Sequence, residues 1–434
     1  MKELTGKSSR VFYGWWIVGA CFLLSLFTGG TFILGFTAFF EPIANEFGWS
    51  YTQVSLAASL RGANMGLLAP LMGFLVDRWG PRRLILGGVV LLGIALILLS
   101  RVTSLSMFYG TFIIVAFGIS GLSPTVLIST ISNWFRRNAG IATGIMACGF
   151  ALGSLLVPTV VRLIDVYDWR TTLFILAIVA FTICIPLSFL VRHKPEQYGY
   201  LPDGDQVNTV MHLEKPAHGK AIEVEVNVGV KEALKSRAFW HIGLAMALLF
   251  LPLSAVVVHV MPYLSSVGIT RSTSSMIATA IPLVSIVGRL SAGWLSDRFN
   301  KTRIATVFII LVGLGLVCFN YVLNDRMWPL IPFVILYGIG WGSNLPMRAA
   351  LMREYFGRNN FGTIFGFMMG MVAIGGVIGP IIAGWVFDNW GSYHAAWLLF
   401  ACIVLISSII MATTPSAAAN VRRGDNREYF QDTN

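Results

Sequence analysis

Long apolar stretches alternate with short polar segments over most of this chain. A helix rises about 1.5 Å per residue and therefore needs about 20 apolar residues to cross the hydrocarbon core of a membrane. No apolar stretch alternates with a period of two residues, which argues against a transmembrane β-barrel. The pattern predicts twelve membrane-spanning helices, at roughly 14–40, 52–76, 83–100, 107–132, 140–163, 171–191, 239–263, 273–296, 303–323, 328–352, 361–386 and 395–412.

One long hydrophilic stretch interrupts this series after the sixth predicted span. Residues 192–238 contain Pro, Gly and charges of both signs, a composition typical of a linker. We therefore expect an N-terminal six-helix bundle over 1–191, a cytoplasmic linker over 192–238 and a C-terminal six-helix bundle over 239–414. Residues 415–434 are polar and are expected to form a cytoplasmic tail.

Composition and charge support a membrane protein and indicate its orientation. The 434 residues are 56% hydrophobic and 12% charged, whereas soluble domains average about 25% charged. The net charge of +11 reflects Lys and Arg in the predicted cytoplasmic loops, so no nucleic-acid partner is expected. With both termini and the linker inside, 24 Lys and Arg residues lie on the cytoplasmic side and 5 lie outside. We expect a multi-pass protein of the cell (inner) membrane with both termini cytoplasmic.

The two halves of the chain repeat each other. The segment GFLVDRWGPRR (73–83) recurs as GWLSDRFNKTR (293–303), at an offset of 220 residues. Gly and Pro positions of the fourth and fifth predicted spans recur in the tenth and eleventh, at an offset of 222. The repeat unit is therefore half of the protein. Six helices in each unit place the pseudo-twofold axis along the membrane normal.

The repeated loop also resembles a known family. Its first copy is similar to the hallmark cytoplasmic loop of the major facilitator superfamily, and its second copy resembles the loop after span eight of that family. The resemblance implies an all-α membrane fold of two pseudo-symmetric six-helix bundles. Small residues allow close helix packing, and the Asp–Arg pair of each loop is expected to act as a latch between conformers. The expected gating residues are Gly73, Asp77, Arg78, Arg82, Gly293, Asp297 and Arg298.

Four further segments resemble the branch that holds the monocarboxylate transporters and the oxalate/formate antiporters. They are YGWW (13–16), KPEQYGYLPDGD (194–205), HVMPYL (259–264) and GRLSAGWLSDR (288–298). The chain departs from that branch because spans one and eleven lack lysine, and Ser285 stands where animal monocarboxylate carriers have an aspartate. The proton relay of those carriers therefore cannot be transferred to this chain.

Arg61 and Arg289 lie well inside predicted spans, and a charge at the bilayer centre costs about 2.5–3.5 kcal/mol. Arg289 precedes Asp297 by eight residues, about 12 Å along a helix, and Arg61 precedes Asp77 by sixteen, about 24 Å. No Asp or Glu lies in the interior of any predicted span. A guanidinium stays protonated and presents a planar fork that fits a carboxylate. An anionic substrate is therefore the expected partner, and a structural contact to helix-end carbonyls is the alternative.

Other polar residues are weaker candidates. Tyr337, Trp341 and Asn344 share a helix face through i, i+4 and i+7 spacing, and they either line a cavity or pack against other helices. His259 is either a proton carrier or a satisfied polar group near the outer end of its helix. The five cysteines are widely spaced in apolar stretches and the linker histidines lack metal-ligand spacing. No metal site and no cofactor are expected.

The function expected from these residues is secondary transport of a small organic anion, most simply a monocarboxylate, by alternating access. A coupled proton would travel on His259 or on the substrate acid. One alternative is an exporter of lipophilic or cationic compounds, which usually needs an intramembrane acid that this chain lacks. Another is a non-transporting membrane sensor. No HExxH motif or phosphate-binding loop is present, so no enzyme activity is expected. We expect a monomer in the lipid bilayer.

Overall fold

The computed structural model describes residues 12–33, 35–49, 51–204, 228–323 and 325–415. Eleven helical segments in these ranges are long and apolar enough to cross a membrane. At the second predicted span, α3 (Tyr51–Trp79) has 29 residues, more than the roughly 20 that a crossing needs. The predicted all-α membrane fold is confirmed.

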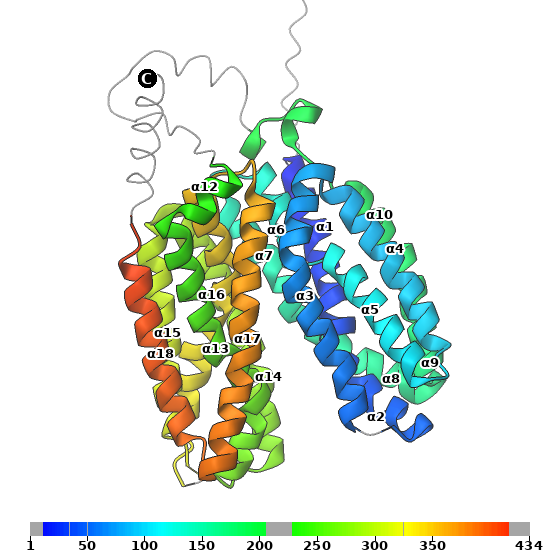
Figure 1. Cartoon of the computed structure of the whole chain (residues 1–434), viewed down its shortest axis with the longest axis vertical. Helices are drawn as coiled ribbons and strands as arrows, with labels where there is room; N and C mark the ends of the chain where they lie inside the picture. Colours follow the sequence, from blue (N-terminus) through cyan, green and yellow to red (C-terminus); the bar gives the residue numbers. More distant parts are fainter. Residues whose placement is uncertain (1–11, 34, 50, 205–227, 324, 416–434) are drawn as a thin grey trace, which may run out of the picture.

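The helices before the linker form one bundle (Figure 1). Three predicted spans consist of two helices each, because a proline in the first turn starts a new helix at α6, α8 and α10. The first predicted span is also interrupted, by a π-helical turn between α1 and α2. The elements of this bundle are α1 (Tyr13–Thr28), α2 (Phe36–Phe47), α3, α4 (Pro81–Ser100), α5 (Leu105–Gly121), α6 (Pro124–Trp134), α7 (Ala139–Leu152), α8 (Val157–Tyr167), α9 (Trp169–Val179) and α10 (Ile185–Leu190), with short turns at Gly29–Ile33, Gly153–Leu156 and Ala180–Cys184.

The helices after the linker form a second bundle beside the first (Figure 1). Its six long helices are less interrupted than those of the first bundle, although four of them contain internal prolines. The last part of the predicted linker forms the short helix α12 (Val230–Lys235) and the first residues of α13. The long helices of this bundle are α13 (Arg237–Ser266), α14 (Arg271–Arg298), α15 (Lys301–Asn320), α16 (Leu330–Phe356), α17 (Phe361–Trp390) and α18 (His394–Ala412).

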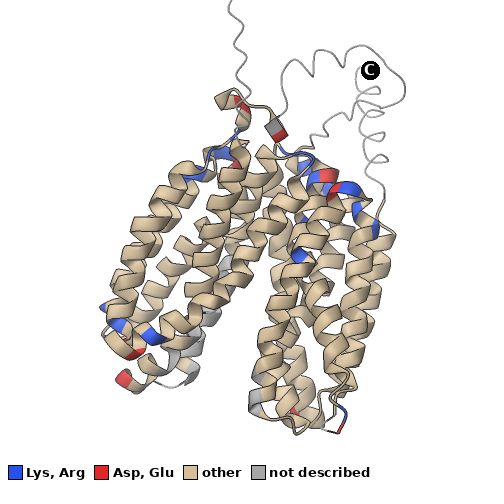
Figure 2. Ribbon diagram, turned by 180° about the vertical axis from the view of Figure 1, so that it is seen from behind, with Lys and Arg blue, Asp and Glu red and all other residues tan. Residues whose placement is uncertain are grey.

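The two bundles meet at the end that carries the linker and diverge toward the opposite end (Figure 1). Lys and Arg gather at the linker end (Figure 2). The contact is made by α3 against α17 and by α7 against α14. A Cβ atom on Gly73 would overlap the carbonyl oxygen of Gly362, and one on Gly293 would lie 2.5 Å from the carbonyl oxygen of Gly140. Only glycine allows backbones to approach this closely, so these residues fix the bundle interface.

Candidate functional site

Arg289 lies deep in α14, where the two bundles are in contact. Its side chain is 8% exposed, and its Nη1 donates a hydrogen bond to the carbonyl oxygen of Ala147 in α7, at 2.9 Å. Its buried Nε has no hydrogen-bond partner, and no described Asp or Glu forms a salt bridge with it. The carbonyl contact engages one of five N–H donors, so the guanidinium retains capacity for an anion. The side chain of Arg61 lies outside the described residues.

A second buried guanidinium lies in α16. The cytoplasmic tally of 24 Lys and Arg residues includes Arg348, and this is wrong, because Arg348 lies within α16, which continues to Phe356, eight residues or about 12 Å beyond it. Arg348 is 2% exposed, its Nη1 lies 3.5 Å from the sulfur of Met369, and its Cζ lies 5.0 Å from the centre of the Phe250 ring. Its Nε and Nη2 have no hydrogen-bond partner among the described residues. Without Arg348 the Lys and Arg tally is 23 to 5, and the orientation argument is unchanged.

The predicted polar face of α16 divides into a packed part and an unsatisfied part. Tyr337 is fully buried and its hydroxyl donates to the carbonyl oxygen of Leu253 at 3.1 Å, so it is a core residue in this conformation. Trp341 is half-buried, and Asn344 is buried with no partner for its Nδ2 in the described part of the chain. The same spacing continues at i+11 to Arg348. Asn344 and Arg348 are therefore neighbours, four residues apart, that both carry unpaired N–H donors.

His259 joins three helices near the end that faces away from the linker. Its Nδ1 lies 3.1 Å from the hydroxyl of Tyr393, and its Nε2 lies 3.0 Å from the carbonyl oxygen of Pro380. Because a carbonyl oxygen can only accept, Nε2 carries the hydrogen and Nδ1 of the neutral ring accepts from the tyrosine. Both ring nitrogens are thus engaged within the bundle. This arrangement favours the structural interpretation of His259 over the proton carrier.

Two aspartates of the repeated loops, Asp77 and Asp297, hydrogen-bond across the interface between the bundles, and each set of bonds forms a clasp. Asp77, near the end of α3, accepts hydrogen bonds from the backbone N–H groups of Gly362 (3.0 Å) and Thr363 (2.7 Å) and from the Thr363 hydroxyl (2.7 Å). Asp297, near the end of α14, accepts from the backbone N–H groups of Gly140 and the next residue, at 2.7 and 2.9 Å. The two contacts are equivalent under the internal repeat. Each one places a carboxylate at the positive end of a helix dipole, in the first turn of α17 or α7.

The arginines of the same loops make different contacts from the aspartates. The guanidinium carbon of Arg82 lies 4.8 Å from the centre of the Phe189 ring, and that of Arg298 lies 4.1 Å from the Trp294 ring. Arg78 is exposed. The expected latch therefore consists of aspartate-to-backbone bonds between bundles, while Arg82 and Arg298 pack on aromatic rings of their own bundle.

The first part of the linker reaches the loops beside both clasps. Its short helical turns are Pro195–Tyr198 and Pro202–Gly204. Asp203 accepts hydrogen bonds from the backbone N–H groups of Arg136 (2.8 Å) and Arg137 (2.7 Å), just before α7. Glu196 forms a 2.5 Å ion pair with Arg358, just before α17. The linker thus connects the two bundles in addition to the two aspartate clasps.

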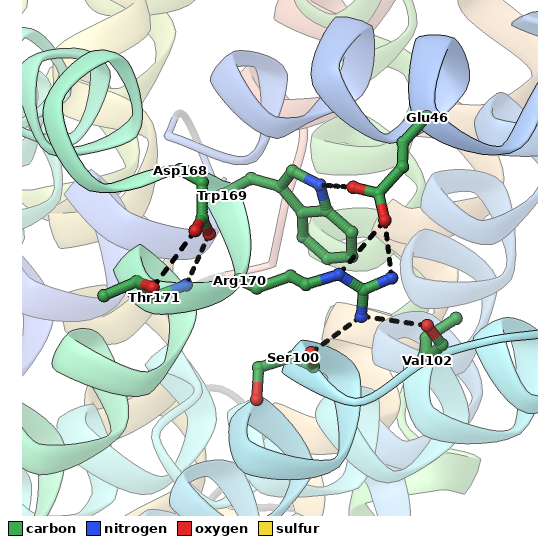
Figure 3. Close-up of polar contacts among 7 residues, drawn as sticks. All are labelled: Glu46, Ser100, Val102, Asp168, Trp169, Arg170 and Thr171. Carbon is green, nitrogen blue, oxygen red and sulfur yellow. Dashed lines mark hydrogen bonds and ion pairs between the residues drawn. The ribbon is translucent and has the colours of Figure 1, made fainter.

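At the opposite end, Glu46 ties three segments of the first bundle together (Figure 3). It accepts hydrogen bonds from Nε and Nη2 of Arg170, at 3.1 and 2.7 Å, and from Nε1 of Trp169, at 2.5 Å. Nη1 of Arg170 donates to the carbonyl oxygens of Ser100 (2.9 Å) and Val102 (3.0 Å), between α4 and α5. The hydrogen bond from Arg170 is the largest cause that lowers the pKa of Glu46 below its ordinary value of 4.5.

The fold therefore consists of two pseudo-symmetric helical bundles of membrane-spanning length, joined at one end by polar contacts, as in a large class of membrane transporters. The chain belongs to the Major Facilitator Superfamily, whose family model matches residues 16–344 and 254–428. It is 26% identical over 411 residues to monocarboxylate transporter 12 of Xenopus laevis, covering 92% of this chain and 88% of the relative. It is 25% identical over 415 residues to monocarboxylate transporter 11 of Homo sapiens, covering 93% and 83%. The predicted resemblance to the monocarboxylate-transporter branch is confirmed.

Solved structures support the fold. The proton:xylose symporter XylE superposes with a TM-score of 0.73 at 14% identity, covering 93% of this chain and 96% of that one. The human organic anion transporter MFSD10 superposes with a TM-score of 0.68 at 13% identity, covering 92% and 99%. Identities this low establish the shared architecture alone.

Proposed function

We propose that this protein is a secondary active transporter of a small organic anion, with a monocarboxylate as its substrate. The burial of Arg289 without an acidic partner among the described residues carries this proposal. An unpaired charge inside a membrane protein is costly, and a carboxylate matches the guanidinium in both charge and geometry. The names of the related monocarboxylate transporters support the same substrate class.

Transport in this proposal follows alternating access. The segments 1–191 and 239–414 move as two units, connected by the linker 192–238 and followed by the tail 415–434. The Lys and Arg tally favours a cytoplasmic linker and cytoplasmic termini in the cell membrane, so the divergence of the bundles away from the linker corresponds to an outward-facing state (Figure 1). Conversion to the inward-facing state breaks the Asp77 and Asp297 contacts and brings the outer ends together.

The contacts of His259 bear on proton coupling. Its ring nitrogens already interact with Tyr393 and Pro380, and no Asp or Glu lies in the interior of any predicted span. We therefore favour the carboxylic acid of the substrate as the carrier of any coupled proton.

Uptake of radiolabelled pyruvate into proteoliposomes tests the proposal. Arg289→Gln keeps a polar side chain but removes the charge, so uptake should fall at least 100-fold, and Arg289→Lys should restore part of it. Arg237→Gln, which removes an exposed guanidinium at the start of α13, should transport like the wild type. Wild-type uptake by correctly folded Arg289→Gln protein, or no pyruvate uptake by the wild type, would refute the proposal.

A further inference from the structure

We infer that Arg348 and Asn344 form a second anion-binding position in the C-terminal bundle and that its ligand is a carboxylate other than the one held by Arg289. This inference rests on the proposed function, because it adds a second carboxylate contact to the same transport path. The two positions lie on different helices: Arg289 belongs to α14 and contacts α7, whereas Arg348 belongs to α16 and contacts α13 and α17.

The first support is the incomplete hydrogen bonding of the Arg348 guanidinium. The group is buried, yet the acceptor contact that it makes is to the thioether of Met369, and sulfur of this kind is a weak acceptor. The Phe250 ring offers a cation–π contact at 5.0 Å but no lone pair for Nε or Nη2. Two charged N–H edges therefore lack an acceptor within the described part of the chain. A carboxylate accepts from such a fork in bidentate geometry.

The second support is Asn344, one turn away on the same face of α16. Its amide nitrogen is buried and also lacks an acceptor among the described residues. A buried polar group without a partner is destabilising, because it has lost its hydrogen bonds to water. The two oxygens of one carboxylate can accept hydrogen bonds from both side chains, so a single ligand group can pair the N–H donors of Arg348 and of Asn344.

The position of α16 connects this site to the transport cycle. α16 packs against α6 and α7 of the first bundle, on the side where the bundles are closed. α17 also lies close to α3 of the first bundle beside Met369. A Cβ atom added to the next residue, Gly370, would lie 3.6 Å from the side chain of Pro70 in α3. The Arg348 surroundings therefore adjoin the surface along which the two bundles must separate.

Arg289 and Arg348 are two buried guanidinium groups on helices of the C-terminal bundle, and their number bears on how many carboxylates bind. One carboxylate neutralises one of them and leaves the other without a counterion. The second carboxylate comes either from the far end of a dicarboxylate or from a second monocarboxylate molecule. Both sources present the same group to Arg348, and counting bound ligands separates them.

Isothermal titration calorimetry on the full-length protein, with pyruvate and with succinate, provides the test. In one supporting outcome, wild-type protein binds one succinate at least tenfold more tightly than one pyruvate, and Arg348→Gln loses that advantage while keeping its pyruvate affinity. In the other, wild-type protein binds two pyruvate molecules, and Arg348→Gln binds one. Asn344→Ala, a milder change, should weaken the second contact by about threefold to tenfold, which keeps the test available if Arg348→Gln does not fold.

Other outcomes overturn the inference. Wild-type affinities and stoichiometries for both ligands in folded Arg348→Gln and Asn344→Ala proteins would show that this position binds no carboxylate. A wild type that binds one pyruvate and an Arg348→Gln variant that binds none would show that both arginines hold the same carboxylate. Failure of the proposed function has a different signature, because Arg289→Gln would then bind the first pyruvate as tightly as the wild type does.

Discussion

Neutralising Asp77 or Asp297 should shift the protein away from the conformation that is closed at the linker end. Asp77→Asn keeps the size of the side chain but replaces one acceptor oxygen with an NH₂ group, although three donors now converge on that carboxylate. Asp297→Asn makes the same change where two backbone donors converge. The amide also loses the attraction between a carboxylate and the helix N-terminus.

The magnitude follows from the number of contacts. A hydrogen bond to a charged group contributes about 1.5–3 kcal/mol, and a neutral one about 1 kcal/mol. Loss of one bond and weakening of the others should cost the clasp about 2–4 kcal/mol at Asp77, and somewhat less at Asp297, where there are fewer bonds. Since 1.4 kcal/mol corresponds to a factor of ten, the Asp77→Asn equilibrium should move by roughly 30-fold to 700-fold.

Electron–electron distances between spin labels measure this shift. Labels at Thr103→Cys and Asn389→Cys occupy exposed positions of the two bundles at the end away from the linker, in a background without native cysteines. Wild-type protein should give mainly the long distance of the diverged state, and Asp77→Asn should give mainly a shorter one. Asp165→Asn, an exposed outer position, is the matched control and should leave the distribution unchanged. An unchanged distribution in both Asp77→Asn and Asp297→Asn would refute the clasp.

Three further perturbations test other contacts. Glu46→Gln should lower the free energy of unfolding by only about 1 kcal/mol at neutral pH, because the ion pair with Arg170 is partly exposed. The wild type should lose the same contribution as pH falls below 4.5 toward the lowered pKa of Glu46. A pH profile of the variant that matches the wild type would contradict this role of Glu46. Glu196→Gln removes the 2.5 Å ion pair with Arg358 and should shift the spin-label distances in the same direction as Asp77→Asn but by less, and no shift would show that the linker contact is not part of the closed end. Gly293→Ala should cost about 1–3 kcal/mol of clasp stability by pushing α7 away from α14, and a wild-type distance distribution would count against the glycine contact.

The architecture was largely predictable from the sequence, because the requirement for about 20 apolar residues per crossing leaves little freedom. The internal repeat makes Gly73 equivalent to Gly293 and Gly140 equivalent to Gly362. The structure shows the contact between the pairs twice, as Gly73 against Gly362 and as Gly293 against Gly140. The interruption between α1 and α2 falls inside a continuous apolar stretch, and the signal for it is the pair Gly29–Gly30 at the start of the π-helical turn.

The candidate site was predictable only in part. Arg289 could be identified from its depth and from the absence of interior acids. Arg348 lies only four residues before the expected end of the span at residue 352 and therefore resembled a cytoplasmic charge, whereas α16 continues to Phe356. The spacing of Tyr337, Trp341 and Asn344 contained the missing signal, since its next position is Arg348. The packing of Tyr337 against Leu253 depends on tertiary contacts that periodicity does not encode.

The most direct test of an anion site at Arg289 is the thermal unfolding of purified protein during titration with pyruvate. A ligand at 100 times its dissociation constant stabilises the state that it binds by about 2.7 kcal/mol. Pyruvate should raise the unfolding temperature of the wild type and of Arg237→Gln by the same amount, and it should not raise that of Arg289→Gln, while choline should leave all three unchanged. A full pyruvate response in Arg289→Gln, or a response of the wild type to choline but not to pyruvate, would contradict the account.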